Sequence, residues 1–431
     1  SSFSIHTPSA LLIHYRFSCS GVLGVFSQQF IFTTFSPEQE QTYHGNNSQK
    51  VGEVMNRTLF KTLGYILSAL TFTGVSTSHA VQPTMAYVEN LKIDLIFDDA
   101  GSFKNDRAAV MIANQGIAQF AMINPDGDIL FTADEINDLD SGVTAYRKDN
   151  LWGIVDRNGK IILQPTYPKI QSFKEGYAAF IKDGMWGFLN TSGQQVVPAK
   201  YDKVGVFSEG LAGFKVNDQW GYLNTEGEEV IKAQFDEIQI FSEQRAAVRV
   251  DEEWGYIDAE GKRLIKPAFA QSRVFREGYA AVFVEGKWGY IDKKGDWLIR
   301  PQFDQAKAFG EGFAVIKQNG LYGFIDSSGE IVVKPYFDDA WNFREGLARV
   351  EKNAKVGYIN TEGQIEIEPE YVWAYSFSDG LAVITYNYRQ YGYINRQGEL
   401  VIEPQFEHAQ PFNEGLAAIK IRDKWGYISR N

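Results

Sequence analysis

The sequence contains few of the residues that hold metals, form disulfides or carry out histidine chemistry. It has one cysteine, Cys19, and five histidines, of which only His408 lies beyond residue 80. A single cysteine cannot form a disulfide within the chain, and a zinc site of the usual kind needs several His or Cys ligands. His408 has no recognisable catalytic partner, and no Gly-x-Ser-x-Gly elbow or phosphate-binding loop is present. We therefore expect no enzyme activity, no cofactor and no metal.

The acidic residues do not indicate a catalytic or metal site either. Asp134, Asp138 and Asp140 lie close together in the sequence, but they lack the Asp-x-Asp-x-Asp-Gly order that wraps a calcium ion. A glycosidase would need two unique carboxylates in a cleft, whereas most acids here recur as repeated sets. A hydrolase with an unrecognised site is therefore the weakest of the functional hypotheses.

Basic residues are scarce relative to acidic ones. The chain has 42 Lys and Arg against 54 Asp and Glu, which gives a net charge of −12. This balance argues against binding to nucleic acid or anionic lipid, because phosphates require clustered Lys and Arg. Hydrophobic residues make up 44% of the chain and aromatic residues 14%, which is ample material for a folded core.

Residues 55–80 have the three parts of a secretory signal peptide. Basic residues lie between Met55 and Lys61, an apolar run covers 63–73, and small residues end at Ala80. The run is shorter than the roughly 20 residues of a membrane-spanning helix. We expect cleavage after Ala80, export to the periplasm or cell surface, and no remaining membrane anchor. Translation is expected to begin at Met55, the alternative being that residues 1–54 form a disordered extension.

The dominant feature of the rest is a repeat marked by an aromatic residue followed by glycine. Successive repeat glycines are 34 residues apart in seven intervals and 35 apart in one. Such regular spacing predicts a repeat architecture. In six copies the pair is Trp-Gly, namely Trp152 and Gly153, Trp186 and Gly187, Trp220 and Gly221, Trp254 and Gly255, Trp288 and Gly289, and Trp425 and Gly426. In the other three, Gly323, Gly357 and Gly392 follow Tyr322, Val356 and Tyr391.

Each unit is interpreted as three short β-strands. In one copy these strands are 279–284, 288–291 and 297–299, all rich in β-branched and aromatic residues. An Asp/Asn-x-x-Gly sequence between the second and third strands predicts a tight hairpin turn. Pro301 after the third strand is expected to end its pairing. A later aromatic residue, such as Phe275, is expected to pack one unit onto the next.

The copies together predict an all-β fold without a second domain. Degenerate copies cover 88–150 and regular ones 151–431, so that 81–431 would be one repeat domain. A unit of 34 residues is short for a four-stranded propeller blade, and ten units exceed the roughly 4 to 8 blades that are typical. We therefore expect small three-stranded antiparallel sheets stacked as an open superhelix, or solenoid. A closed, propeller-like ring is the alternative.

With these motifs the sequence resembles the bacterial WG-repeat proteins, also called KWG-repeat proteins. The resemblance rests on Lys-Trp-Gly-Tyr-Ile-Asp-Lys-Lys-Gly at 287–295 and its copies, with Phe-x-Glu-Gly upstream of each, and it covers 88–431. Ala121, Gln244 and Val356 depart from the pattern in single units. Members of the family are mostly exported or surface proteins without an established activity. The resemblance therefore implies an architecture and leaves function open.

Two repeated features could bind ligands. The Trp-Gly pairs could offer stacking faces to sugars, although we expect each Trp to be core and each Gly to make room for an aromatic side chain of the adjacent strand. The Glu-Gly turns could form a carboxylate ladder for cations, although a solvated acid beside a turn glycine is the simpler interpretation. The acids of these turns are Glu175, Glu209, Glu277, Glu311, Glu345, Asp379 and Glu414.

The aromatic-rich segment 371–393 is the best candidate for a contact surface. It holds the single 35-residue interval, and insertions in repeat proteins often lie in loops on the binding face. A local aromatic core is the alternative. The residues expected to contact a partner are Trp341, Tyr371, Trp373, Tyr375, Tyr386 and Tyr388. The sequence thus favours a non-catalytic scaffold for a protein partner in the cell envelope, with glycan or cell-wall binding as the alternative.

Overall fold

The computed structural model describes residues 90–114, 116–139 and 142–430. In these ranges the chain forms forty β-strands and no helix, and the strands make ten four-stranded antiparallel sheets. None of the described residues therefore belongs to a helix of the length and hydropathy that crosses a bilayer. The regions assigned to an upstream extension (1–54) and a signal peptide (55–80) lie outside the described residues.

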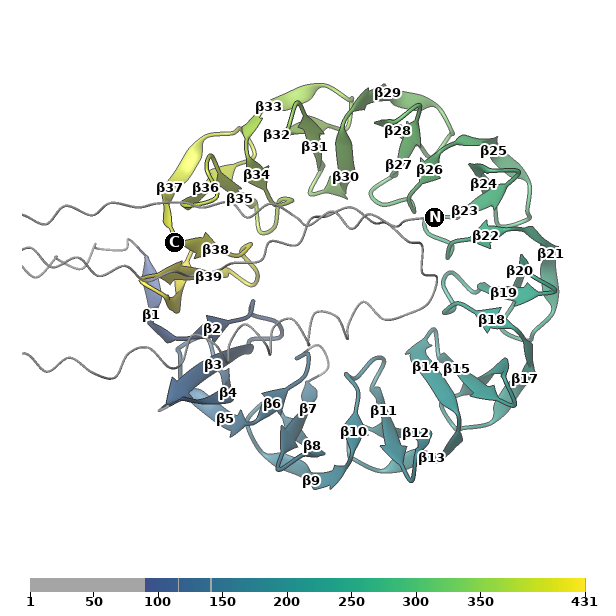
Figure 1. Ribbon diagram of the computed structural model, residues 1–431, viewed down its shortest axis with the longest axis horizontal. Helices are drawn as coiled ribbons and strands as arrows, with labels where there is room; N and C mark the ends of the chain where they lie inside the picture. The colour runs from purple at the N-terminus through teal and green to yellow at the C-terminus, as the bar shows by residue number, and fades with distance from the viewer. Residues whose placement is uncertain (1–89, 115, 140–141, 431) are drawn as a thin grey trace, which may run out of the picture. The chain divides into compact units, whose positions relative to one another are not determined.

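The sheets follow one another as the blades of a ring (Figure 1). We number them in chain order, from blade 1 (β2–β5) to blade 9 (β34–β37), and blade 10 consists of β38, β39, β40 and β1. The innermost strands are β2 (Asp99–Ala100), β6 (Glu135–Ile136), β10 (Lys169–Ile170), β14 (Lys203–Ser208), β18 (Glu237–Ile238), β22 (Gln271–Ser272), β26 (Gln305–Ala306), β30 (Asp339–Arg344), β34 (Trp373–Ala374) and β38 (His408–Ala409). The second strands are β3 (Ala108–Asn114), β7 (Val143–Lys148), β11 (Tyr177–Lys182), β15 (Leu211–Val216), β19 (Ala246–Val250), β23 (Tyr279–Val284), β27 (Phe313–Gln318), β31 (Leu347–Lys352), β35 (Leu381–Thr385) and β39 (Leu416–Ile421).

The third strands carry the aromatic-Gly motif, and the outermost strands complete each blade. The third strands are β4 (Ile117–Ile123), β8 (Leu151–Asp156), β12 (Met185–Asn190), β16 (Gln219–Asn224), β20 (Glu253–Ile257), β24 (Lys287–Asp292), β28 (Leu321–Asp326), β32 (Lys355–Asn360), β36 (Tyr391–Asn395) and β40 (Lys424–Ser429). The outermost strands are β5 (Ile129–Ala133), β9 (Ile161–Tyr167), β13 (Gln195–Tyr201), β17 (Glu229–Phe235), β21 (Arg263–Phe269), β25 (Trp297–Phe303), β29 (Ile331–Phe337), β33 (Ile365–Tyr371), β37 (Leu400–Phe406) and β1 (Leu91–Phe97).

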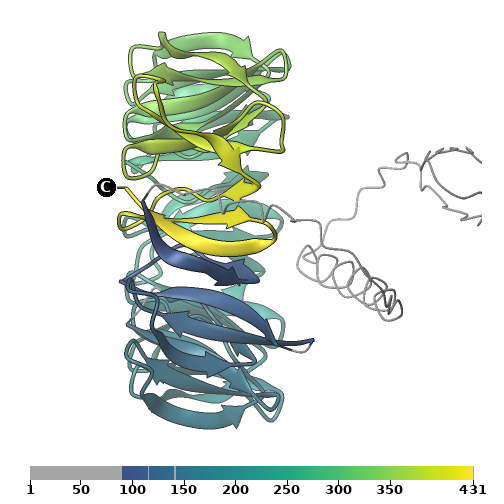
Figure 2. The same ribbon diagram turned by 90° about the vertical axis from the view of Figure 1, so that its left-hand side faces the viewer.

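The two ends of the described chain meet in one blade and close the ring. Strand β1 is the outermost strand of blade 10 and pairs with β40, with Leu91 opposite Ile428 and Phe97 opposite Trp425. Figure 2 shows this strand beside the last strands of the chain. The expected open superhelix is therefore wrong, and the alternative of a propeller-like ring is correct.

The expectation of three-stranded units is wrong as well, because each unit contains a fourth strand, which has only two residues in eight of the ten blades and six in β14 and β30. In blade 7 this strand is β26, whose two residues pair with Lys317 and Ile316 of β27. The second and third strands are joined by equally short turns, such as Asn319 and Gly320, both with positive φ. Four strands consequently fit into 34 residues, which is the length that had argued against a blade.

The Trp-Gly motif accommodates a bulge in the outermost strand. Trp288 pairs with Phe303 and Tyr290 with Ile299, so two extra residues of β25 face Gly289. A Cβ atom on Gly289 would lie 2.6 Å from the Ile299 carbonyl oxygen and 2.7 Å from the Pro301 nitrogen. The glycine thus makes room for backbone, and not for an aromatic side chain as expected. Pro301 lies within the bulge and does not end the strand, which continues to Phe303.

The other motif glycines meet the same bulge, and blade 1 provides the exception that explains the motif. The glycines that a Cβ would bring into collision with the outermost strand are Gly153, Gly187, Gly221, Gly255, Gly289, Gly323, Gly357, Gly392 and Gly426. In blade 1 the position is Ala121, and there the pairing runs without interruption from Phe120 opposite Ala133 to Met122 opposite Phe131. The motif glycine and the bulge therefore occur together.

Aromatic rings pack each blade onto the next. Phe241 of blade 5 meets Tyr222 of blade 4 edge-on, with ring centroids 4.9 Å apart, and the Tyr222 hydroxyl donates to the Gln239 carbonyl at 2.6 Å. The prediction that this repeated aromatic residue packs one unit onto the next is confirmed. The contact recurs at the closure, where Phe103 of blade 1 meets Tyr427 of blade 10 at 4.9 Å.

Candidate functional site

The acids of the Glu-Gly turns link neighbouring blades around the ring. Each lies in the turn between the innermost and second strands and has a positive φ, 55° at Glu209. The carboxylate accepts hydrogen bonds from the same turn of the next blade, in this case from Glu243 N at 2.6 Å and Gln244 N at 2.7 Å. Links of this kind are made by Glu175, Glu209, Glu243, Glu277, Glu311, Glu345, Asp379 and Glu414.

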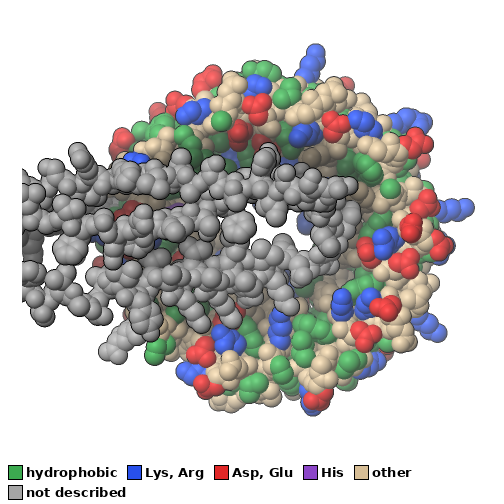
Figure 3. Space-filling model, in the orientation of Figure 1, with side chains coloured by type: hydrophobic (Ala, Val, Ile, Leu, Met, Phe, Trp, Pro, Cys, Tyr) green, Lys and Arg blue, Asp and Glu red, His purple; other side chains and the backbone are tan. Residues whose placement is uncertain are grey.

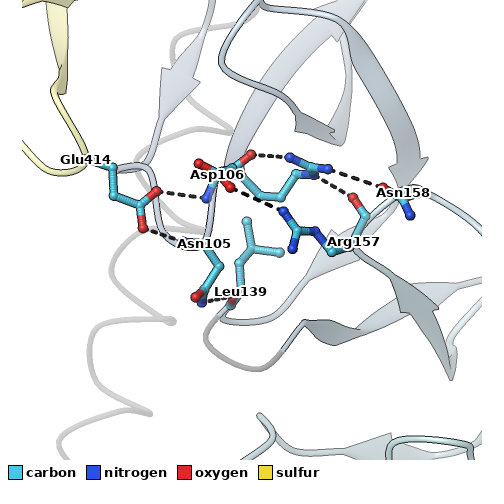
Figure 4. Close-up of polar contacts among 7 residues, drawn as sticks. Asn105, Asp106, Leu139, Arg157, Asn158 and Glu414 are labelled. Atoms are coloured by element: carbon cyan, nitrogen blue, oxygen red, sulfur yellow. Dashed lines mark hydrogen bonds and ion pairs between the residues drawn. The ribbon is translucent and has the colours of Figure 1, made fainter.

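The last link crosses the closure of the ring. Glu414 of blade 10 accepts hydrogen bonds from Asn105 N at 2.6 Å and Asp106 N at 2.8 Å in blade 1 (Figure 4). These carboxylates therefore form neither the cation ladder nor the simply solvated row that the sequence allowed. In the described residues no group of three or more His, Cys, Asp or Glu side chains is placed to hold a metal ion.

A second set of acids caps the turns between the second and third strands. Asp236, which follows Phe235 at the end of an outermost strand, accepts a hydrogen bond from Asp251 N at 3.1 Å. Asp251 and its neighbour Glu252 both have positive φ, so the carboxylate satisfies a strained two-residue turn. Such caps are formed by Asp134, Asp202, Asp236, Asp338 and Glu407, and in blade 1 Asp98 accepts from Ala113 N within β3. Both repeated acidic sets thus serve the fold.

Blades 8 and 9 contain a cluster of side chains that the repeat pattern does not explain. Arg349 lies in β31 opposite Tyr358, at a position that other blades fill with a small or apolar side chain. In the other nine blades the counterparts of Arg349 are Ala109, Ala145, Ala179, Gly213, Ala247, Ala281, Val315, Val383 and Ala418. Arg349 is nevertheless only 7% exposed, which is unusual for a charged side chain.

The Arg349 guanidinium contacts two indole rings. Its central carbon is 3.6 Å from the Trp341 ring centroid and 4.9 Å from that of Trp373, and the two rings are edge to face at 6.3 Å. Nη1 donates to the Ala374 carbonyl, and the enclosed Nε has no acceptor. Burial lowers the pKa of Arg349, partly offset by Tyr358 and Asp339. We call Trp341, Arg349 and Trp373 the Trp-Arg cluster.

The six residues expected to contact a partner fall into two adjoining groups. Trp341, Trp373 and Tyr375 are half-buried and lie on or directly after innermost strands, with Trp373 and Tyr375 rings 6.3 Å apart. Tyr386 and Tyr388 are 42% and 58% exposed. They lie in the loop 386–390, between β35 and β36, where the extra residue of the 35-residue interval is accommodated.

The loop 386–390 packs against the junction between blades 8 and 9. The Tyr386 ring lies 5.2 Å from that of Tyr371, and the Tyr388 hydroxyl donates to the Val372 carbonyl at 3.2 Å. Tyr371 itself is buried at the end of β33, so its ring does not face solvent. The two groups are therefore joined through residues 371–373.

The remaining candidates have structural surroundings. Trp152, Trp288 and Trp425 are buried, and the other motif tryptophans, Trp186, Trp220 and Trp254, are half-buried. His408 lies between the rings of Tyr391 and Trp425, at 5.1 and 5.3 Å, and burial lowers its pKa. Of the three aspartates considered for calcium, Asp140 is outside the described residues.

Arg349 is the feature that sequence reasoning missed. It departs from the Ala-Ala or Ala-Val of other copies, as in Leu-Ala-Arg-Val at 347–350, and an alignment of the copies would have shown it. The same comparison would have shown Lys307, whose ammonium group donates to the Ala340 carbonyl at 2.8 Å. A residue that breaks a repeat needs its own explanation, because the fold does not require it in the other blades.

Comparison with known sequences supplies the family. The sequence profile described as "WG containing repeat" matches residues 89–115, 152–186, 186–220, 220–254, 254–288, 288–322, 322–355, 357–389 and 391–425. The chain belongs to the WG-containing-repeat family. The resemblance noted from the motifs is confirmed, and the nine matched segments, each of which spans parts of two adjacent blades, together reach all ten blades. No curated protein sequence matches the chain significantly.

Solved structures that resemble the chain are distant. BamB from Moraxella catarrhalis has a TM-score of 0.30 at 10% identity, covering 64% of this chain and 97% of its own. The C-terminal WD40 domain of Sif2 has a TM-score of 0.31 at 10% identity, covering 62% and 97%. PorZ from Porphyromonas gingivalis has a TM-score of 0.25 at 10% identity, covering 79% and 60%. The fold assignment therefore rests on the chain's own strand pairing.

Proposed function

We propose that the protein is a non-catalytic interaction scaffold of the cell envelope, which binds a protein partner through the Trp-Arg cluster and the adjoining loop 386–390. The proposal of an envelope location rests on the signal-peptide pattern of residues 55–80. The proposal of a scaffold rests on the repeat architecture, because a ring of similar units presents a long continuous surface.

The observation that carries the proposal is the break in repeat chemistry at blades 8 and 9. Trp341 stands where blade 9 has Tyr375 and the other blades have Gly, Asn, Gln, Lys or Arg, and it leaves the Ala374 carbonyl to be satisfied by Arg349. In comparable positions, Gln239 and Gln410 donate directly to the next blade. The fold therefore works without a tryptophan here. Half-exposed aromatic rings next to an arginine are the residue types most enriched at protein interfaces.

The proposal is tested by capture from the native envelope. The exported full-length protein is immobilised, bound proteins are identified by mass spectrometry, and binding is then measured with the purified candidate. Trp341→Ala combined with Trp373→Ala should weaken that binding by at least about tenfold. Tyr336→Ala is the matched control, because Tyr336 is 54% exposed on the outermost strand β29. A partner that binds the double variant as tightly as the wild type would contradict the proposal.

Binding to a glycan or to cell wall is the second candidate. It is favoured by the exposure of Tyr386 and Tyr388, because the solvent-facing sides of their rings could stack on sugars. Retention on insoluble peptidoglycan or glucan that is lost in Tyr386→Ala, Tyr388→Ala would support it. Full recovery of both the wild type and the variant in the unbound fraction would exclude glycan binding.

A further inference from the structure

Three basic residues on the inner side of blades 6 to 8 have no carboxylate partner among the described residues. The Arg273 guanidinium lies over the Trp288 ring at 4.9 Å, and Lys307 and Arg349 donate to backbone carbonyls. We call Arg273, Lys307 and Arg349 the cationic arc. Burial lowers the pKa of Lys307, and after a partial offset by Asp339 the charges of Arg349 and Arg273 lower it further. The three cations therefore act on one another.

Two arginines on the second strands of other blades are paired with carboxylates of the innermost strand. In blade 2, Arg147 pairs with Glu135 of the innermost strand at 2.9 Å, and in blade 5, Arg249 pairs with Glu237 at 2.8 Å. The chain as a whole is acidic, with a net charge of −12. A group of unpaired cations on such a molecule is a specific point of attraction for an anion.

The arc borders the centre of the ring. Figure 3 shows an opening there, and the innermost strands surround it in Figure 1. Lys307 follows the innermost strand β26, and Trp341 lies in the innermost strand β30. On the visible rim, by contrast, acidic and basic side chains are interspersed (Figure 3).

The geometry of Arg349 is suited to a planar anion. The guanidinium is held against two indole rings, so its plane and the position of its charge beside the opening are fixed. Within the described chain Nη1 has an acceptor in Ala374, whereas Nε has none. Asp339 offsets the burial of Arg349 only in part, and no carboxylate of the described residues forms an ion pair with it, so a bound carboxylate would lower the cost of burying this charge.

We propose that the cationic arc and the Trp-Arg cluster bind an acidic segment of the protein partner. The Asp or Glu carboxylates of that segment would face Arg273, Lys307 and Arg349, and its apolar atoms would lie on Trp341 and Trp373. This inference rests on the scaffold function proposed above and specifies the chemistry of the partner. Three cations on an acidic chain are too few for a nucleic-acid backbone, whose binding requires many phosphate contacts.

The test uses the full-length protein and a fluorescein-labelled oligoglutamate peptide, with oligoglutamine of the same length as the neutral probe. Fluorescence anisotropy at low salt should show at least about tenfold tighter binding of oligoglutamate, and added salt should weaken it. The double variant Arg273→Gln, Lys307→Gln should lose about tenfold in affinity. These two side chains are substituted because a glutamine at 307 can still donate to the Ala340 carbonyl, as Gln239 donates to Ser272 in blade 5, whereas Arg349→Gln removes the bond to Ala374 and can destabilise blade 8.

Arg249→Gln is the matched control, because it removes one positive charge that is already paired with Glu237. Its affinity for oligoglutamate should equal that of the wild type, and thermal melting should show that every variant is folded. Equal affinity for both peptides, or equal losses in the control and the double variant, would overturn the inference. A captured partner could need Trp341 and Trp373 for binding but not Arg273 and Lys307. That result would contradict the proposal of an acidic segment, and the proposal of a scaffold would still hold.

Discussion

At the scale of the residue, the Trp-Gly motif is explained by the space around a single Cα atom. Gly289 has an ordinary negative φ, so its backbone conformation does not require glycine. The requirement comes from the bulged backbone of β25, which passes where a side chain would begin. Trp288 pairs with Phe303 at one end of the bulge and Tyr290 pairs with Ile299 at the other, so the glycine lies between the two residues that hold its ends.

Gly289→Ala is expected to destabilise the protein by roughly 1–3 kcal/mol, because the new methyl group collides with backbone that cannot rotate away. Gly205→Ala is the control, since a Cβ there meets nothing closer than 3.5 Å. Urea denaturation of the two variants measures the difference. Equal midpoints for Gly289→Ala and the wild type would show that the bulge yields to a methyl group.

Residue identities that recur could be predicted, and those that do not recur were missed. The packing role of residues such as Phe241 followed from its register in every copy. The reason for the glycine could not be predicted, because the bulge involves two strands whose pairing the sequence does not display. Arg349 could not be found from the pattern that the copies share, because only one copy has an arginine at this position.

At the scale of the element, neighbouring blades are joined by side chains that reach into the next turn. Glu243 accepts a hydrogen bond from Gly278 N at 2.9 Å in the next blade, and it pairs with Lys293 at 3.0 Å. Burial opposes ionisation of this carboxyl, but the hydrogen bonds from Lys293 and Gly278 outweigh it and lower its pKa. Blade packing is thereby coupled to the charge state of the linking acid.

The contribution of Glu243 should depend on pH. Because its pKa is lowered in the folded state, its stabilisation is fully present above the pKa of the unfolded chain and disappears as pH falls through the folded-state pKa. Glu243→Gln is expected to cost about 1 kcal/mol at neutral pH, and the difference from the wild type should vanish in acid. Urea midpoints measured from neutral to acidic pH give this difference. Glu253→Gln, at an exposed position, should show no such trend.

Turns and long strands were predictable, whereas the innermost strand was not. The Asn224 turn forms as the Asn-x-x-Gly pattern indicates, with Gly227 N donating to the Asn224 carbonyl at 3.0 Å. A strand such as β26 has two residues, which is too short to show an alternating pattern. Missing this element made the unit appear too small for a blade, and the error in the fold class followed from it.

At the scale of the molecule, closure of the ring depends on contacts between the two ends of the described chain. Strand β1 completes blade 10, and Ser429 N donates to the Asn90 carbonyl at 2.9 Å. Closure could not be decided from the sequence because an open array and a ring use the same contacts between neighbours. Only the sum of small rotations between blades distinguishes them.

Two rearranged chains test closure. A chain without residues 91–97 leaves the edge of β40 unpaired, so it should melt at a lower temperature and self-associate on size-exclusion chromatography. A circular permutant that joins 429 to 90 through a short linker and opens at the turn 183–184 keeps all ten blades, and it should melt like the original. A deletion that changes neither property would argue against the ring.

The closing link of Glu414 with Asn105 and Asp106 gives blade 1 and blade 10 the same two-sided support as every other blade. An open array loses its terminal copies first, because each has only one neighbour to hold it. A ring offers no such starting point for fraying, so local opening must break two junctions at once. The described part of the chain is therefore expected to unfold in a single cooperative transition despite its modular sequence.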